Sequence, residues 1–522
     1  MRGVGTVLFL VVLATMVATG ARRWRIPAPS LLVVAGLVVA LLPGSPAIEV
    51  TPEIIGLVVL PPLLYASAED VSWRELRAVW KPVSVLAVGL VLASAAVVGY
   101  VASVITPLSW QMALVLGAVL ASTDPVAVTA LGRRLALPPK VQAMVQAESL
   151  FNDATSLVLF KVAVGVAVAA SAVSWPGAGA EFALLAGGGT LIGAAVAGVV
   201  VLIRRRTEDP VLETVVALVT PYAAYVLAEA AHTSGVTSVV VAGVVLGGRS
   251  DRLTSARIRL QLHAVYGTVV FLLESVVFSL IGLSLPGLID ELGDGDRLWP
   301  LYALALAGTL IAVRMLWIFP LSALLQWKGG QRRTNWRVPV VLSWAGTRGV
   351  MPLAAALSIP VTTAGGAVLP GRPLVLVLTT SVVVVTLVVQ GFSLAAVVRR
   401  SGIALEPDRT EREEARARLG LAEAGLRRLD EMSELEAVPE VVADRLRRAL
   451  QARQEHALER LDDTTDSATE SAEHVYRQLR RDLIVEETAE LQRLYDGHRI
   501  SDSTRRRLQR SLDLEEARLS GS

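Results

Sequence analysis

The 522-residue sequence contains no cysteine and only five histidines. The lack of cysteine excludes disulfides, thiolate metal sites and cysteine nucleophiles. With few imidazoles and no thiolates, the chain is poorly equipped to bind transition metals. The formal net charge of +2 is uninformative by itself, unlike its distribution along the chain. We expect no cofactor and no nucleic-acid partner.

Long hydrophobic runs are what the sequence has in excess. Hydrophobic residues make up 53% of the chain, and the mean hydropathy is +0.55, more than a soluble domain needs to bury a core. Charge is sparse in residues 1–400 and dense in residues 401–522. These features predict an all-α polytopic membrane domain over 1–400, followed by a helical tail over 401–522.

The hydrophobic runs separate into about thirteen segments, each long enough to cross roughly 30 Å of hydrocarbon. Their predicted first residues are Val4, Pro27, Glu53, Pro82, Pro107, Val141, Phe182, Val211, Val236, Leu260, Trp299, Val338 and Pro373.

Positive charge is concentrated in alternate loops, including "RRWR" from Arg22, "RRR" from Arg204 and "KGGQRRTNWR" from Lys328. The positive-inside rule then places the N-terminus outside and the C-terminus in the cytoplasm. The first segment could instead be a cleaved signal peptide. Cleavage would leave "RRWR" on the translocated side, against the pattern of the later loops, so we expect this segment to be retained.

The tail has charged, leucine-spaced helical character, with breaks predicted near Pro439, at "DDTTDSATE" and at "YDGHRISDS". Its leucines could form stripes for a small bundle or a partner helix. The mixture of acids and bases is also typical of solvated helices, which is the interpretation we favour. The sequence does not identify a partner for the tail.

Polar residues gather in the middle of the sixth hydrophobic segment. Glu148 and Asn152 are four residues apart, as are Ser149 and Asp153, so both pairs lie on one face of a helix. At 1.5 Å per residue, Asp153 would lie about 18 Å from the start of the segment, near mid-membrane. A charge at that depth is costly, so such residues normally pair, line water or bind an ion.

The fifth segment contains "ASTDPVAV", in which Pro125 lacks an amide hydrogen and disfavours helix at Asp124. We expect the helix to break near Thr123 and Asp124 and to free carbonyl oxygens. Interrupted helices are where transporters place cation sites.

The twelfth segment is interrupted at "SWAGTRGVMPLAAALSIP", where Gly346, Gly349 and Pro352 surround Arg348. The fifth and twelfth segments enter from opposite sides, as two inverted repeats joined by one span would. The predicted fold therefore has inverted repeats with two broken, crossing helices, although no self-similarity of the sequence demonstrates them.

Glu148 and Arg348 are natural partners, because both would lie about 10 to 15 Å from the cytoplasmic side. We predict a buried ion pair with a structural role, because breaking such a pair strands a charge at a cost of about 3 to 5 kcal/mol.

If Glu148 pairs with Arg348, no positively charged partner is left for Asp153. Oxygen atoms of Asp153, Ser149, Thr123 and Asp124 would form a hard site for a small alkali ion. Burial disfavours an ionised carboxylate, so a proton and a cation would compete for it. Asn152, unlike a second aspartate, adds no charge. The residues therefore predict one-for-one, electroneutral exchange.

Five other charged side chains fall within the hydrophobic segments. Glu274 could lie near a cation pathway or pair with Arg314. Lys161 is predicted to snorkel to the outer interface. Glu213 and Glu229 lie toward opposite ends of the eighth segment, where they could line funnels or face water.

The motifs "STDPVAV", "ESLFNDATSLVLF" and "GTRGVMPLAAAL", in this order, resemble the monovalent cation:proton antiporters, in particular the electroneutral branch of bacterial sodium/proton exchangers. The likeness covers about the first four hundred residues, and the "ND" pair is typical of the branch. One departure is Ala66, where some members carry a glutamate.

The resemblance implies a core domain that moves against a dimerisation domain, in a homodimer embedded in the lipids of the bacterial cytoplasmic membrane. It also implies binding of cation and proton by four residues with Asn152 in support, and a structural pair of Glu148 with Arg348. The four binding residues are Thr123, Asp124, Ser149 and Asp153.

Two other classes of protein stay open. An intramembrane aspartyl protease needs two buried aspartates, for which Asp124 and Asp153 are available, and a cation channel would also use buried oxygen ligands. Pro125 and Asn152 suit cation coordination better than proteolysis. Sequence spacing does not distinguish Na+, Li+ and K+.

Overall fold

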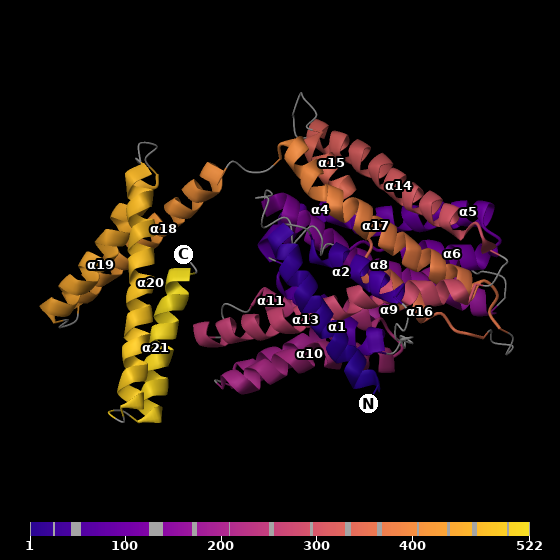
Figure 1. Cartoon of the computed structure of the whole chain (residues 1–522). Coiled ribbons are helices and arrows are strands. Elements are labelled where there is room, and N and C mark those ends of the chain that lie inside the picture. Colours follow the sequence, from indigo (N-terminus) through magenta and orange to yellow (C-terminus); the bar gives the residue numbers. More distant parts are fainter. Residues whose placement is uncertain are drawn as a thin grey trace. The chain divides into compact units, whose positions relative to one another are not determined.

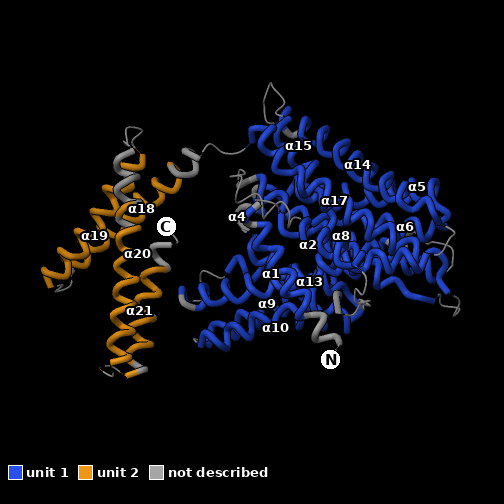
Figure 2. Tube along the Cα trace, viewed as in Figure 1, with its two compact units in different colours: residues 1–404 blue, residues 405–522 orange. Residues whose placement is uncertain are grey.

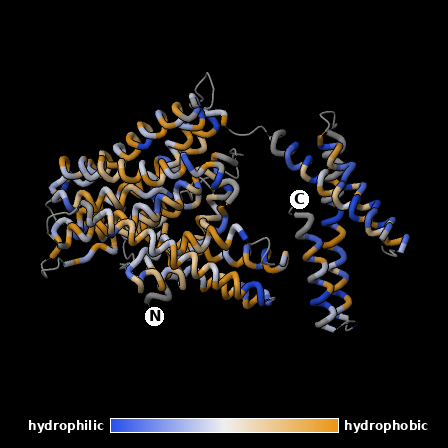
Figure 3. Tube along the Cα trace, turned by 180° about the vertical axis from the view of Figure 1, so that it is seen from behind, coloured by the Kyte–Doolittle hydropathy of each residue, from blue (hydrophilic) through white to orange (hydrophobic). Residues whose placement is uncertain are grey.

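The chain divides into two compact units, Met1–Ala404 and Leu405–Ser522 (Figure 2). Colouring by hydropathy shows that hydrophobic residues predominate in the first unit, whereas hydrophilic and hydrophobic residues alternate along the helices of the second unit (Figure 3). The computed structural model describes residues 2–24, 27–42, 54–71, 73–124, 139–169, 175–207, 209–249, 255–292, 296–328, 336–362, 368–403, 407–435, 439–461, 467–497, 499 and 501–520.

The described part of the first unit is built from helices (Figure 1). Its N-terminal half contains α1 (Arg2–Trp24), α2 (Ala28–Ala40), the π-helix η1 (Ile54–Val59), α3 (Leu60–Glu69), α4 (Trp73–Ser84), the π-helix η2 (Val85–Leu90), α5 (Val91–Ile105), α6 (Trp110–Leu120) and α8 (Pro139–Ala169). Its C-terminal half contains α9 (Trp175–Arg204), α10 (Pro210–Ala230), α11 (Gly235–Gly247), α13 (Ala256–Asp290), α14 (Trp299–Lys328), α15 (Arg337–Trp344), α16 (Val350–Leu357) and α17 (Arg372–Ser401).

Seven stretches of the described helices are long and apolar enough to cross a membrane, and five shorter apolar helices accompany them. Each predicted hydrophobic segment contains helical structure, which confirms the all-helical, membrane-spanning character of the first unit. The count of thirteen crossings and the inverted repeats stay predictions.

The helix ends where the first interruption was predicted, and the second predicted interruption is present. Helix α6 ends at Leu120, and Ser122–Asp124 are not helical. Helix α15 ends at Trp344, and a non-helical stretch over Gly346–Gly349 leads into α16. Pro125 and the rest of the predicted fifth segment lie outside the described residues. Pro352 falls in the first turn of α16, where proline is tolerated.

Glycines allow the membrane helices to pack with their backbones in contact. A methyl group on Gly36 of α2 would collide with the Ser279 carbonyl of α13, and one on Gly282 of α13 would collide with the Val33 carbonyl of α2. Close approach through small residues is how helices associate where no hydrophobic effect separates them from lipid. These contacts join α2 firmly to α13.

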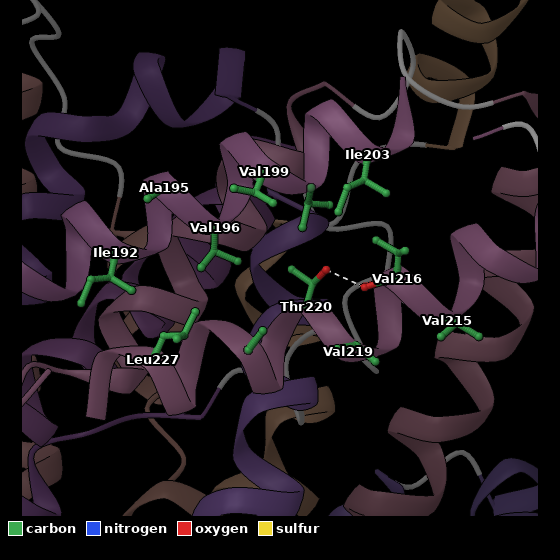
Figure 4. Close-up of a pocket in the computed structure, with 12 residues that line it drawn as sticks. Ile192, Ala195, Val196, Val199, Ile203, Val215, Val216, Val219, Thr220 and Leu227 are labelled. Atoms are coloured by element: carbon green, nitrogen blue, oxygen red, sulfur yellow. Dashed lines mark hydrogen bonds between the residues drawn. The ribbon is translucent and has the colours of Figure 1, made fainter. Parts of the chain in front are cut away.

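The surface between α9 and α10 is an apolar groove of about 640 Å³ (Figure 4). Ile192, Val196 and Val199 line its α9 side, and Val215, Val219 and Leu227 line its α10 side. The Thr220 hydroxyl donates to the Val216 carbonyl of its own helix, 2.6 Å away, so it offers the groove little polar chemistry. This is a lipid-compatible surface and carries none of the predicted site residues.

The second unit contains α18 (Pro407–Leu435), α19 (Glu440–Glu459), α20 (Ser467–Asp496) and α21 (Asp502–Ser520). Its helix ends fall at the breaks expected from the sequence. Helices α18 and α19 pack together, as do α20 and α21. In the second pair, Arg480 contacts Glu515 at 2.7 Å and Glu487 at 3.1 Å, and hydrogen bonds to these carboxylates raise the pKa of Arg480.

Candidate functional site at the crossing of two interrupted helices

The polar face of α8 meets the interruption that follows α6. The Ser122 hydroxyl donates to Oδ1 of Asp153, and the Ser149 hydroxyl donates to the Thr123 carbonyl at 2.5 Å. Nδ2 of Asn152 donates to Oγ1 of Thr123 at 3.0 Å. All five side chains are buried. The polar residues at the centre of α8 therefore satisfy one backbone carbonyl of the interruption and bond two of its side chains.

The two interruptions are hydrogen-bonded to each other. The Asp124 amide donates to the Thr347 carbonyl, and the Thr347 hydroxyl donates to the Asp124 carbonyl, both at 2.8 Å. The Asp124 carboxylate lies against the α-carbon of Gly349, where any larger side chain would collide with it. Since Gly349 precedes α16, this places a negative charge at the positive end of a half-helix.

Arg348 has a different partner from the one predicted. Its Nη1 donates to the Ala121 carbonyl at 2.9 Å and to the Ser122 carbonyl. The last carbonyls of a helix have no intrahelical partner, and a cation there is also favoured by the helix dipole. The predicted Glu148–Arg348 pair is therefore wrong, because the end of α6 takes the Arg348 guanidinium.

Glu148 is instead paired with Arg314 of α14. Nη1 and Nη2 of Arg314 donate to the two carboxylate oxygens at 2.5 and 2.9 Å, and its Nε donates to the Leu342 carbonyl at 3.1 Å. The Glu148 and Arg314 side chains are 1% and 3% exposed. A buried bidentate pair, in which Nε of the arginine is also hydrogen-bonded, fits the structural role expected of Glu148. Its partner, however, is Arg314 and not Arg348.

Glu274 does not use Arg314, whose three nitrogen atoms all donate to Glu148 or Leu342. The Glu274 side chain, from the middle of α13, is half-buried. It lies close enough to Asp124 for the two charges to act on each other. The structure thus brings an acid of α13 toward the crossing of the interrupted helices.

Lys161 and Glu229 contact each other, although the sequence suggested separate interfacial roles. Nζ of Lys161 donates to the two carboxylate oxygens of Glu229 at 2.7 and 3.0 Å. Glu229 also accepts from the amide of Gly235, at the start of α11, at 3.1 Å. Glu213, at the other end of α10, is buried. It lies close enough to Arg204 for the guanidinium charge to act on its carboxylate. It therefore does not simply face water.

Sequence reasoning missed Ser122, Arg314 as the partner of Glu148, and Thr347. Ser122 directly precedes Thr123 and Asp124, so its position beside the break was a usable signal. No comparable signal existed for Arg314, because the chain has more than one buried arginine and only the helix packing distinguishes them.

A family profile described as the transmembrane sodium/hydrogen exchanger matches residues 8–400. The chain belongs to this family. It is therefore a multi-pass membrane transporter and not an enzyme, and the family's substrates are cations and protons.

Two relatives and one solved structure illustrate the similarity. The chain is 34% identical to an uncharacterized Na(+)/H(+) exchanger of Mycobacterium tuberculosis, over 99% of this chain and 97% of that one. It is 32% identical to the Na(+)/H(+) antiporter ApNhaP of Aphanothece halophytica, over 73% and 70%. The sodium proton antiporter MjNhaP1 from Methanocaldococcus jannaschii aligns at a TM-score of 0.61 over 78% of this chain and 98% of that one, with 21% identity, which shows a shared fold.

Proposed function

We propose that this protein exchanges Na+ for H+ across the bacterial cytoplasmic membrane, with one buried carboxylate, Asp153, holding either ion in turn. The observation that carries the proposal is the position of Asp153. It is 7% exposed, lies near the middle of α8 and faces the break that follows α6. A carboxylate beside irregular backbone within a membrane domain is the arrangement in which transporters bind cations.

The surrounding groups supply oxygen ligands for an alkali ion. Hydroxyls of Thr123 and Ser149 and the carboxylate of Asp124 lie at the same crossing as Asp153. The amide oxygen of Asn152 is buried and has no hydrogen-bond partner among the described residues, so it is available to a cation. Asn152 supports the site without adding charge.

Competition at Asp153 makes the exchange one for one. Bound Na+ or bound H+ neutralises the same carboxylate, so both loaded forms carry the same charge through the membrane. Li+ and K+ are alternative cations that the same hard oxygen ligands could accept. The structural Glu148–Arg314 pair and the Arg348 contacts keep their charges in both forms, so they do not enter the stoichiometry.

The remaining features of the proposal follow the family resemblance. Alternating access moves the body that carries the interrupted helices against the rest of the membrane unit, and the protein is a homodimer surrounded by membrane lipids. The N-terminus lies outside, whereas the C-terminal tail over 401–522 lies in the cytoplasm and serves regulation or interaction with a partner. Glu274 and Arg314 border the pathway, Glu274 through its charge near Asp124 and Arg314 through Glu148.

The experiment uses purified protein in vesicles that contain a pH-sensitive dye. A pulse of Na+, Li+ or K+ should change the internal pH in the direction set by the cation gradient. Asp153→Asn should abolish this change at normal abundance of folded protein, because an amide cannot exchange a proton for a cation. Asp209→Asn is the matched control, since Asp209 is an exposed N-cap of α10 and asparagine caps helices equally well. Full transport by Asp153→Asn would refute the central role of Asp153.

The same vesicles test electroneutrality and the rival functions. An imposed membrane potential should leave the initial rate of exchange unchanged, whereas a steep dependence would contradict one-for-one exchange. A channel would pass current across a planar bilayer in the absence of a proton gradient. Family membership disfavours both the channel and the aspartyl protease.

A further inference from the structure

The Lys161–Glu229 pair joins two helices that have different main neighbours. Helix α8, which carries Lys161 and Asp153, packs mainly against α6 and α4, and less extensively against α9 and α11. Helix α10, which carries Glu229, packs mainly against α11, α9 and α13. The pair therefore links the helix of the candidate ion site to a body that does not contain that site.

The Glu229 side of the contact is rigid. Glu229 is anchored by the Gly235 amide, and the Ser234 amide donates to the Leu185 carbonyl of α9 at 3.2 Å. Gly189 and Gly193 of α9 lie directly against backbone atoms of α11. The corner between α10 and α11 is thus held to α9 by hydrogen bonds and by close backbone packing.

The boundary between α8 and this body is loosely filled beside the site. A cleft of about 520 Å³ lies between the face of α8 that carries Phe151, Ala154 and Val158, residues of α4 and η2, and Phe182 of α9 with Thr237 of α11. Because interiors that move as one piece are closely packed, an open apolar boundary marks a place where two bodies can shift. Lys161 and Glu229 connect the same two bodies eight residues farther along α8 than Asp153, about 12 Å at 1.5 Å per residue.

We propose that the Lys161–Glu229 pair is an outer latch, which closes the route from Asp153 to the outside and must open once in every transport cycle. The proposal rests on the function and the orientation proposed above, which place the C-terminal half of α8 and the end of α10 at the outer side. Its energetics suit a latch: the side chains are 30% and 37% exposed, so the pair is only half-buried and opens at a lower cost than a fully buried pair.

The latch predicts an asymmetric change in cation affinity. Lys161→Gln and Glu229→Gln remove the attraction that favours the closed state, so the population shifts toward the state open to the outside. The half-saturating concentration of external Na+ should fall about two- to fivefold, the range open to an exposed pair, and that of internal Na+ should rise. The charge-reversed double variant Lys161→Glu with Glu229→Lys should restore both values. A merely structural pair would lower protein abundance without this opposite change on the two sides.

Cross-linking gives the decisive test. Because the sequence contains no native cysteine, only the introduced cysteines can react with the reagent. Lys161→Cys with Glu229→Cys is reconstituted, treated with a short bifunctional thiol reagent, and assayed for Na+-driven pH change before and after reduction. We expect at least tenfold inhibition that reduction reverses. Each single cysteine variant, and the double variant treated with a monofunctional reagent, should keep their transport.

The outcomes separate this proposal from the proposed function. Untreated wild-type protein that exchanges Na+ for H+ supports the function, and a verified cross-link that leaves transport intact then overturns the latch alone. Wild-type protein with no exchange overturns both. If the double cysteine variant fails to fold, equal half-saturating Na+ concentrations for Lys161→Gln and wild type, measured from each side, overturn the latch.

Discussion

Two ion pairs on α8 differ in burial and in what they can do. Glu148 pairs with Arg314 before Asp153 in the sequence, and Lys161 pairs with Glu229 after it. The side chains of the first pair are at most 3% exposed, whereas those of the second are 30% and 37% exposed. One helix thus carries a sequestered pair and an accessible pair on either side of the candidate ion site.

The difference in burial suits the two ion pairs to different roles: one can hold α8 in place, and the other can control its movement. Breaking a buried pair leaves an uncompensated charge in a medium that solvates it poorly, at a cost of about 3 to 5 kcal/mol. An exposed pair contributes about 1 kcal/mol or less. The buried pair is therefore suited to holding α8 and α14 together throughout a cycle, and the exposed pair to opening and closing within it.

Arg314→Ala should have the largest effect on the folded protein. It strands the Glu148 carboxylate, so we expect a loss of stability of about 3 to 5 kcal/mol and little folded protein after extraction in detergent. Size-exclusion chromatography and a thermal unfolding assay measure both. The control is Arg205→Ala, which removes an exposed arginine after α9. Equal stability of the two variants would contradict the structural role of the Glu148–Arg314 pair.

Gly349→Ala should impair transport strongly without removing a charge. The added methyl group would occupy the space of the Asp124 carboxylate, so Asp124 must leave the start of α16. We expect at least a tenfold lower exchange rate in vesicles, measured with the internal pH dye. Gly308→Ala on α14 is the matched control, since its methyl group would meet nothing within 4 Å. Normal exchange by Gly349→Ala would show that this placement of Asp124 is dispensable.

Arg348→Ala should destabilise the protein less than Arg314→Ala. It leaves the Ala121 and Ser122 carbonyls without their donor, at a cost of about 1 to 3 kcal/mol for unsatisfied buried groups, but it strands no carboxylate. Thermal unfolding of the two variants side by side tests this order. If Arg348→Ala were the more damaging, the Arg348 contact with α6 would matter more than the buried ion pair.

Lys161→Gln should have the smallest effect on stability. Its unfolding temperature should be only slightly below that of wild type, because the contact that it removes is half-buried and worth about 1 kcal/mol or less. Added salt should diminish even this difference, since accessible charges are screened. A large loss of stability in the thermal assay would place the Lys161–Glu229 pair in the same class as the buried one.

The sequence predicts local features of this protein better than it predicts partners. Pro125 and the pair of Gly346 and Gly349 were sufficient to locate both interruptions, because the constraints that break a helix act on neighbouring residues. The four-residue spacing in α8 likewise predicted which side chains would share a face. These inferences need only the chain's own periodicity.

Which residues pair between different helices depends on distances in space, and the spacing of residues along the sequence does not determine these distances. Glu148 was assigned to Arg348 from their similar depths, and the actual partner, Arg314, follows from how α14 packs beside α8 and α15. Lys161 was expected at the outer interface and Glu229 near one end of the eighth segment, but their contact requires the α10–α11 corner to lie beside α8. The role of Arg348 was hidden for the same reason, although the free carbonyls that it binds were expected.

The paired hydrogen bonds between Asp124 and Thr347 make the two interrupted segments move together. Two segments more than 220 residues apart in sequence cannot slide past each other while both bonds hold. A displacement of either would take with it the Asp124 carboxylate, the Arg348 guanidinium and the ends of α6 and α16. The Asp124 carboxylate would therefore stay at the N-terminus of α16 and the Arg348 guanidinium at the C-terminus of α6 during such a displacement. The dipole of each helix would keep its neutralising charge within the membrane.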